Sequence, residues 1–143
     1  MKDCLQCLQY LATHTVEVGL ASSASARSRT LLAIHEHGAP AMRIPARPVV
    51  KPALSQASTR AAMSAAMFSA CAAANSGDLS AVTSALEDAG KAGVDGIHAS
   101  NDKGIPPPNS PIPLKEGKSG TTPLVDTGQL YNDFDFAIAV TKG

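Results

Sequence analysis

The fold is decided by the stretch Met63-Ser-Ala-Ala-Met67-Phe68-Ser-Ala-Cys71-Ala-Ala-Ala-Asn75-Ser76-Gly77-Asp78-Leu79. Residues 53–74 contain neither proline nor glycine, and their apolar side chains recur at helical spacing. The Asn-Ser-Gly triplet at 75–77 is typical of a helix end, and Asp78 or Ser80 of the next helix start. We therefore predict two alanine-rich helices, over 53–74 and from about 78 to 92. The apolar stripe of the first consists of Leu54, Ala57, Ala61, Met63, Met67, Phe68 and Cys71.

Alternation of apolar with polar or small residues predicts three short strands, over 14–21, 30–37 and 134–140. The small polar residues 22–29 predict a mobile loop, so we expect the first two strands to form a hairpin. The apolar sides of the strands consist of Val16, Val18, Leu20, Leu32, Ile34, Phe134, Phe136, Ile138 and Val140.

Prolines interrupt the rest of the chain. Pro45, Pro48 and Pro52 predict an extended segment over 43–52, because proline cannot donate a ladder hydrogen bond. Residues 104–122 predict a second extended arm. The predicted fold class is α+β: a small antiparallel sheet, two Ala-rich helices and long Pro-rich arms in one domain. Its segments are a lead over 1–13, a hairpin with the proline segment over 14–52, a helical pair over 53–95, an arm over 96–125, and a short helix with a strand over 126–143.

Composition predicts a thin core. Much of the 44% hydrophobic content is alanine, and the chain has three Phe, two Tyr and no Trp. Alanine buries little area, so we expect modest stability and order that depends partly on neighbouring subunits. The net charge is zero, but residues 27–60 carry six basic residues against one acidic, and residues 61–102 carry one against five. Such patches are either ordinary solvated surface or complementary contacts between copies.

Asp126-Thr127-Gly128 has two interpretations. The triplet resembles the nucleophile signature of aspartic proteases, which need two carboxylates sharing one proton. The same residues form a good helix start, with Asp126 at the N-cap, Gln129 at N3, and a hydrophobic staple between Val125 and Leu130. Only fifteen residues follow Gly128, too few for the rest of a protease site. We therefore expect a structural cap, with an aspartic-type hydrolase as an alternative.

Neither cysteines nor histidines predict a strong site. Cys4 and Cys7 have redox-pair spacing without a preceding strand, so we interpret them as small packing residues. His35 and His37 share a face of the expected strand, near His14, but lack further ligands at a fixed spacing. A small Cys/His redox or metal module stays an alternative. We predict no catalytic residue, metal, cofactor, signal peptide or membrane span.

Two segments together resemble a known family. The first is Ile34-His-Glu-His-Gly38 with Arg43-Ile-Pro-Ala-Arg-Pro48-Val-Val-Lys-Pro52-Ala-Leu54. The second is Gly104-Ile-Pro-Pro-Pro-Asn109-Ser-Pro111, Lys115-Glu-Gly117-Lys118 and Pro123-Leu-Val-Asp-Thr-Gly-Gln-Leu130. This combination is similar to neck or tail-completion proteins of tailed bacteriophages, including relatives of the phage Mu virion-morphogenesis protein and minor tail protein Z.

The resemblance implies a non-enzymatic structural protein of the virion neck, assembled in the host cytoplasm as a homo-oligomeric ring. It implies the portal or its adaptor, or tail-terminator and tail-tube proteins, as neighbours, and DNA passing through the lumen without sequence-specific binding. Extended segments can add to a neighbour's sheet edge, so we expect contacts from 43–54 and 104–124. Arg47 is the first candidate for an intersubunit charge pair, with a solvated loop residue as the alternative. The candidate contact residues are Arg43, Pro45, Arg47, Pro48, Lys51, Pro106, Pro107, Asn109 and Pro111.

Overall fold

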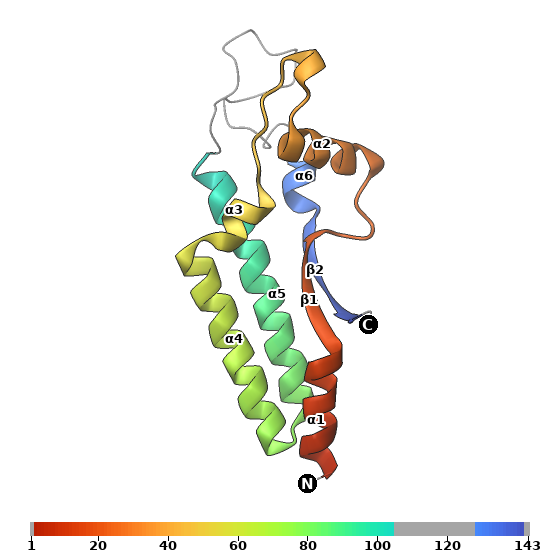
Figure 1. Ribbon diagram of the computed structural model, residues 1–143, viewed down its shortest axis with the longest axis vertical. Helices are drawn as coiled ribbons and strands as arrows, with labels where there is room; N and C mark the ends of the chain where they lie inside the picture. The colour runs from red at the N-terminus through yellow and green to blue at the C-terminus, as the bar shows by residue number, and fades with distance from the viewer. Residues whose placement is uncertain (1, 105–127, 142–143) are drawn as a thin grey trace.

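A computed structural model describes residues 2–104 and 128–141 and combines helices with a two-stranded antiparallel sheet (Figure 1). This arrangement confirms the predicted α+β fold class. In chain order the elements are α1 (Lys2–Thr13), β1 (His14–Leu20), α2 (Ala26–His37), the 3-10 helix η1 (Pro40–Met42), α3 (Val50–Ser55), α4 (Ala57–Ser76), α5 (Leu79–Asp102), α6 (Gln129–Asn132) and β2 (Phe134–Val140).

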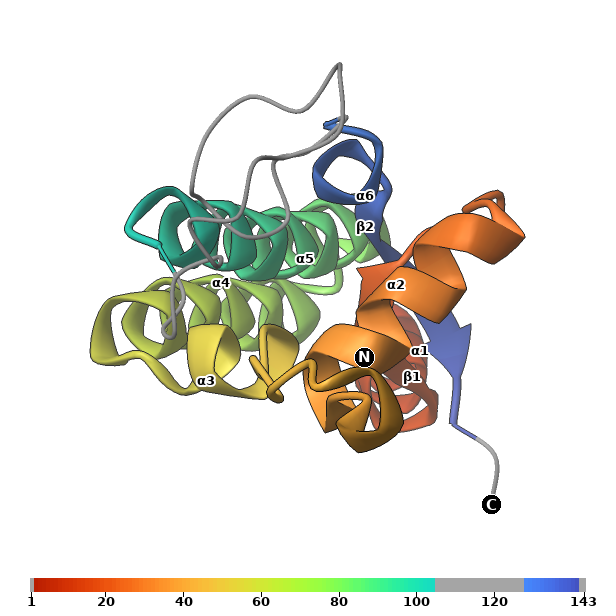
Figure 2. The ribbon, with the colours of Figure 1, turned by 90° about the horizontal axis from the view of Figure 1, so that it is seen from above.

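Helix α5 occupies the middle of the molecule. It packs against α4 on one side and against β1 and β2 on the other, and the views from the front and from above agree (Figures 1 and 2). Glycines on α5 allow this close packing. A Cβ added at Gly90 would lie 2.9 Å from Cβ of Phe136 in β2, and one at Gly96 would lie 3.0 Å from Cβ of Thr59 in α4. The absence of side chains at these two positions brings both neighbours close to the helix backbone.

The α4–α5 connection is as predicted. Gly77 ends α4 in the left-handed conformation (φ 77°), and its N–H donates to the carbonyl of Ala74 at 3.1 Å. Asp78 then caps α5, since its Oδ1 accepts a hydrogen bond from Ala81 N at 2.9 Å. The predicted end of α5 near residue 92 is wrong, because the helix continues to Asp102. Its glycines cost helix propensity, but packing on both sides of the helix outweighs that cost.

The strands predicted over 14–21 and 134–140 are confirmed, but their pairing differs from the prediction. β1 pairs with β2 in antiparallel register, with Val16 opposite Ile138 and Val18 opposite Phe136. These side chains point toward α5, and Phe134 at the start of β2 is buried. The sheet therefore joins the two ends of the described chain.

The strand predicted over 30–37 is wrong, and so is its hairpin with 14–21. These residues belong to α2, which begins inside the stretch predicted to be a mobile loop. Ser25 caps this helix by accepting a hydrogen bond from Ser28 N at 3.0 Å, and Gly38 ends it with φ 72°. An apolar run of a few residues cannot separate a strand from a short helix, so the flanking caps decide.

The proline segment also differs from the prediction. Residues 50–55 form the short helix α3, and Gln56, with extended backbone, separates it from α4. Pro52 is tolerated because it lies in the first turn, where its missing N–H has no helical acceptor. The single helix predicted over 53–74 is therefore two helices.

The core has two clusters, which follow the thin composition. The upper cluster joins α3, α5, α6 and β2 through Val49, Ala53, Ile97, Leu130 and Phe134. The lower cluster joins α1, α4 and α5 through Cys7, Ala70, Ala74, Val82, Ala85 and Leu86. Alanine fills much of the lower cluster, so the helices there pack close together through small side chains.

Candidate functional site

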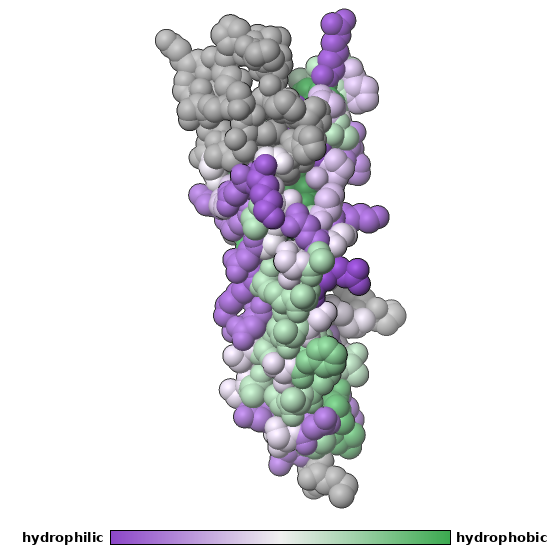
Figure 3. All heavy atoms as spheres, turned by 90° about the vertical axis from the view of Figure 1, so that its left-hand side faces the viewer, coloured by the Kyte–Doolittle hydropathy of each residue, from purple (hydrophilic) through white to green (hydrophobic). Residues whose placement is uncertain are grey.

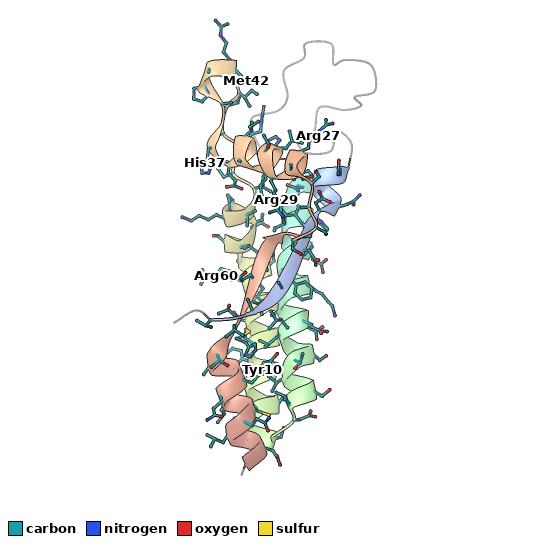
Figure 4. The ribbon with its side chains drawn as sticks, turned by 90° about the vertical axis from the view of Figure 1, so that its right-hand side faces the viewer. Tyr10, Arg27, Arg29, His37, Met42 and Arg60 are labelled. Atoms are coloured by element: carbon teal, nitrogen blue, oxygen red, sulfur yellow. The ribbon has the colours of Figure 1, made fainter. Side chains whose placement is uncertain are left out.

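The predicted contact segment is largely exposed. Arg43, Pro45, Pro48 and Lys51 lie on the surface, and the neighbouring Met42 lies at one end of the long axis (Figure 4). Arg43 is the one described non-glycine residue with a left-handed backbone (φ 55°), at the end of η1. The candidates Pro106, Pro107, Asn109 and Pro111 lie outside the described residues.

Arg47 is 7% exposed, so the solvated alternative for this residue is wrong. Its backbone N–H donates to the carbonyl of His35 at 2.6 Å. Burial, and then the nearby Arg47 charge, lowers the pKa of His35, while Glu36 acts in the opposite direction. Glu36 Oε1 accepts hydrogen bonds from Val49 N (2.8 Å) and Val50 N (3.0 Å). These contacts attach residues 47–50 to α2 within one protomer.

The predicted cap lies only partly in the described chain. Helix α6 begins at Gln129 with Gly128 at its N-cap position, so Gln129 occupies N1 rather than the expected N3. Leu130 is buried at 4% exposure in the upper core cluster. Val125 and Asp126 lie outside the described residues, and their capping contacts stay a prediction.

The histidines do not gather. His35 and His37 lie on α2 rather than on a strand, and His14 stacks on Tyr10 with ring centroids 3.7 Å apart. His98, which falls within the arm predicted over 96–125, lies on α5 instead. It stacks on Tyr131 at 4.1 Å and donates from Nε2 to the Tyr131 carbonyl at 3.0 Å. Within residues 2–104 and 128–141, no three His, Cys, Asp or Glu side chains gather as a metal-binding group.

The cysteines lie on helices and differ in exposure. Cys7 is 1% exposed in the lower core cluster, whereas Cys71 is exposed on α4 and Cys4 is half-buried. Burial and then Cys4 raise the pKa of the Cys7 thiol, which favours the protonated form. A reactive cysteine requires the opposite shift, so the geometry supports a packing role for Cys7.

The lower part of α4 carries an exposed apolar surface. Phe68 is 78% exposed and Met67 41% exposed. The apolar stripe predicted for this helix is therefore not its buried side, which consists of Thr59, Ala70 and Ala74. Ala61, Ala65 and Ala72 are exposed nearby at the same helical period. Figure 3 shows the apolar colour spreading over this part of α4 and onto the end of the molecule formed by α1, where Leu5 and Leu8 are exposed. This surface has the composition of a helix contact.

The sheet carries a different exposed face on the opposite side of the molecule. The side chains that point away from α5 are Thr15, Glu17, Asp135, Ala137 and Ala139, with Gly19 between them. A hollow of about 250 Å³ opens there, lined by Glu17, Gly19, Leu20, Ser22, Asp135 and Ala137 among others. Within the part of the chain that is described, neither Glu17 nor Asp135 has a basic side chain within ion-pair distance.

Sequence reasoning found part of this face. The alternation over 14–21 already separates Glu17 from the apolar side of the strand. Its pairing with the acidic side of 134–140 depends on the long-range register of β1 and β2, which no local pattern provides.

Comparisons with protein-family models, with curated proteins and with solved structures found no match. Among the described helices, none is both long enough and apolar enough to cross a membrane.

Proposed function

We propose that this chain is a structural protein of a tailed-bacteriophage virion, assembled as a homo-oligomeric ring in the neck between head and tail. The observation that carries the proposal is the joint presence of the two motif segments, over 34–54 and 104–130, in one short α+β chain. The proposal places the chain among non-enzymatic proteins, with copies of itself and the portal, adaptor or tail proteins as partners.

The shape and surface of the molecule suit such a role. The described chain is elongated, with η1 and Met42 toward one end and α1 at the other (Figures 1 and 4). The proline segment follows Met42, and its exposed residues are available to a neighbour along that axis. These residues are Arg43, Pro45 and Pro48. Exposed apolar side chains on α1 and α4 are costly on a free monomer and are typical of proteins that assemble.

Two measurements test the proposal. Mass spectrometry of virions from a strain that carries the gene should detect the chain as a stoichiometric component. Native mass spectrometry of the purified protein should detect a multiple-copy species. A small monomer or dimer that is missing from virions would refute the neck role.

A further inference from the structure

Two exposed surfaces of this molecule complement each other in charge. Arg60 is the one charged residue of α4, and it is exposed. The outer face of the sheet carries two exposed carboxylates, Glu17 and Asp135. None of the three has an ion-pair partner of opposite charge within the described residues. One Asp135 oxygen accepts a hydrogen bond from Phe136 N at 2.8 Å, which leaves the other oxygen available to a cation.

The same two surfaces complement each other in size. On α4, Phe68 projects with 78% of its surface exposed, flanked by alanines. On the sheet, the outward side chains beside Glu17 are small, since Ala137 and Ala139 face outward and Gly19 has no side chain. A large aromatic side chain buries apolar area and excludes water when it packs on a surface of small side chains.

Contacts inside the protomer show how the surfaces align along the long axis. A Cβ at Gly77 would lie 3.3 Å from Cys4 N, and α1 and α4 run antiparallel (Figure 1). Phe68 precedes Gly77 by as many residues as Thr13 follows Cys4, a rise of about 14 Å in each helix. Phe68 and Thr13 are therefore level. Because the carbonyl of Thr13 accepts a hydrogen bond from Thr141 N at 2.7 Å, Phe68 is also level with the end of β2.

The charged groups lie at matching heights above this level. Arg60 precedes Phe68 by eight residues, which places it about 12 Å along α4 and about 80° around the helix from Phe68. Glu17 follows Thr13 by four residues, about 13 Å along β1. Each surface thus has its charge above its apolar or small part, with nearly the same separation.

The two surfaces lie on opposite sides of the molecule, with α4 on the left of Figures 1 and 2 and the sheet on the right. A rotation about an axis parallel to the long axis can place α4 of one copy against the sheet of the next. Because such a rotation preserves height, groups at the same height then face each other. We propose that α4 of each copy packs on the outer face of the β1–β2 sheet of a second copy, with Arg60 facing Glu17 and Asp135, and Phe68 over Ala139. A contact of this head-to-tail kind generates a closed ring when the rotation between successive copies closes. The inference deepens the proposed function and names its subunit contact.

Charge exchange between the two surfaces tests the contact. Arg60→Glu alone, and Glu17→Lys with Asp135→Lys, should each weaken self-association at least roughly tenfold, because each places like charges together. Combining all three substitutions should restore association. Arg27→Glu is the matched control, since it makes the same charge change at an exposed residue of α2. Analytical ultracentrifugation over a concentration series provides the measurement, with circular dichroism to verify folding.

The apolar half of the contact has its own variant. Phe68→Asp should weaken association to a similar degree, whereas Met42→Asp, at a residue that is 69% exposed elsewhere, should not. The inference is overturned if the wild-type chain stays monomeric at every concentration, or if it associates and neither Arg60→Glu nor Phe68→Asp changes that association. Virion composition separates this failure from failure of the neck role. If Arg60→Glu and Phe68→Asp leave association unchanged and both variants are incorporated into virions, the neck role stands and the contact is wrong. If the wild-type chain associates through these residues but is missing from virions, the contact stands and the neck role is wrong.

Discussion

Replacing Gly90 by alanine tests whether α5 is the middle layer. In a solvated helix this substitution stabilises by roughly 0.8–1.0 kcal/mol, since glycine is a poor helix former. In this structure the new methyl group would overlap the Phe136 ring and lie 2.9 Å from Phe136 Cβ. The ring cannot swing away from an atom so close to its own backbone, so overpacking should cost about 1–3 kcal/mol. The helix gain offsets part of that cost, and we expect a net loss of roughly 0–2 kcal/mol.

The assay is urea unfolding of the purified protein followed by circular dichroism, with the melting temperature as a second readout. The expected loss corresponds to a fall of up to roughly 7 °C in melting temperature for a chain of this length. Gly19→Ala is the matched control, because a Cβ there would meet no atom within 4 Å, and it should change stability little. A more stable Gly90→Ala protein would refute the packing of α5 against β2, since only an open helix face yields that sign.

Three further predictions concern caps and titrating groups. Asp78→Ala should cost about 1 kcal/mol in urea unfolding, because α5 loses the acceptor for an N-terminal amide. The free energy of unfolding should fall as the pH drops below about 6.5, since the lowered pKa of His35 means that the fold disfavours its protonated form. Replacing His35 with Asn should flatten this pH dependence, whereas replacing the exposed His37 should not. Alkylation followed by mass spectrometry should modify Cys71 in the folded protein and Cys7 only on unfolding, and stability should decline above about pH 8.5 because the fold favours the Cys7 thiol over its thiolate.

The sequence predicted elements well where a local signal is complete. Gly77 and Asp78 together specify the end of α4 and the start of α5, and both residues act as expected. The alternation over 134–140 likewise predicts β2. Each of these signals involves residues within a few positions of one another, so a short stretch of sequence contains the whole physical cause.

The wrong predictions share a different cause. Residues 30–37 carry too few apolar residues to distinguish the period of a strand from that of a helix, and Ser25 and Gly38 at the flanks decide the outcome. Glycines inside α5 resemble a helix end when read locally. They are tolerated because Phe136 and Thr59, both far away in the sequence, fill the space that side chains would have occupied.

The candidate site was predictable only in part for the same reason. Pro45 and Pro48 marked a surface segment correctly, but Arg47 between them turns inward and lies beside His35. No local pattern reports that, because the contact depends on α2 being a helix that ends at Gly38. Proline content indicates an irregular backbone, and only the tertiary contact determines which side chains of that backbone remain available to a partner.

The exposed face of α4 is the strongest support for the proposed packing against another copy. A helix that is apolar on its inner side alone would satisfy the protomer, yet α4 also carries Met67 and Phe68 outward and alanine around them. A soluble monomer gains nothing from Phe68, one of three phenylalanines in a chain whose core is short of large side chains. If Phe68 instead packs on the small residues of a neighbouring sheet, the apolar area missing from the protomer core is recovered between protomers. On that reasoning Phe68→Asp should reduce association while leaving the stability of the monomer nearly unchanged, a combination that a buried core residue cannot produce.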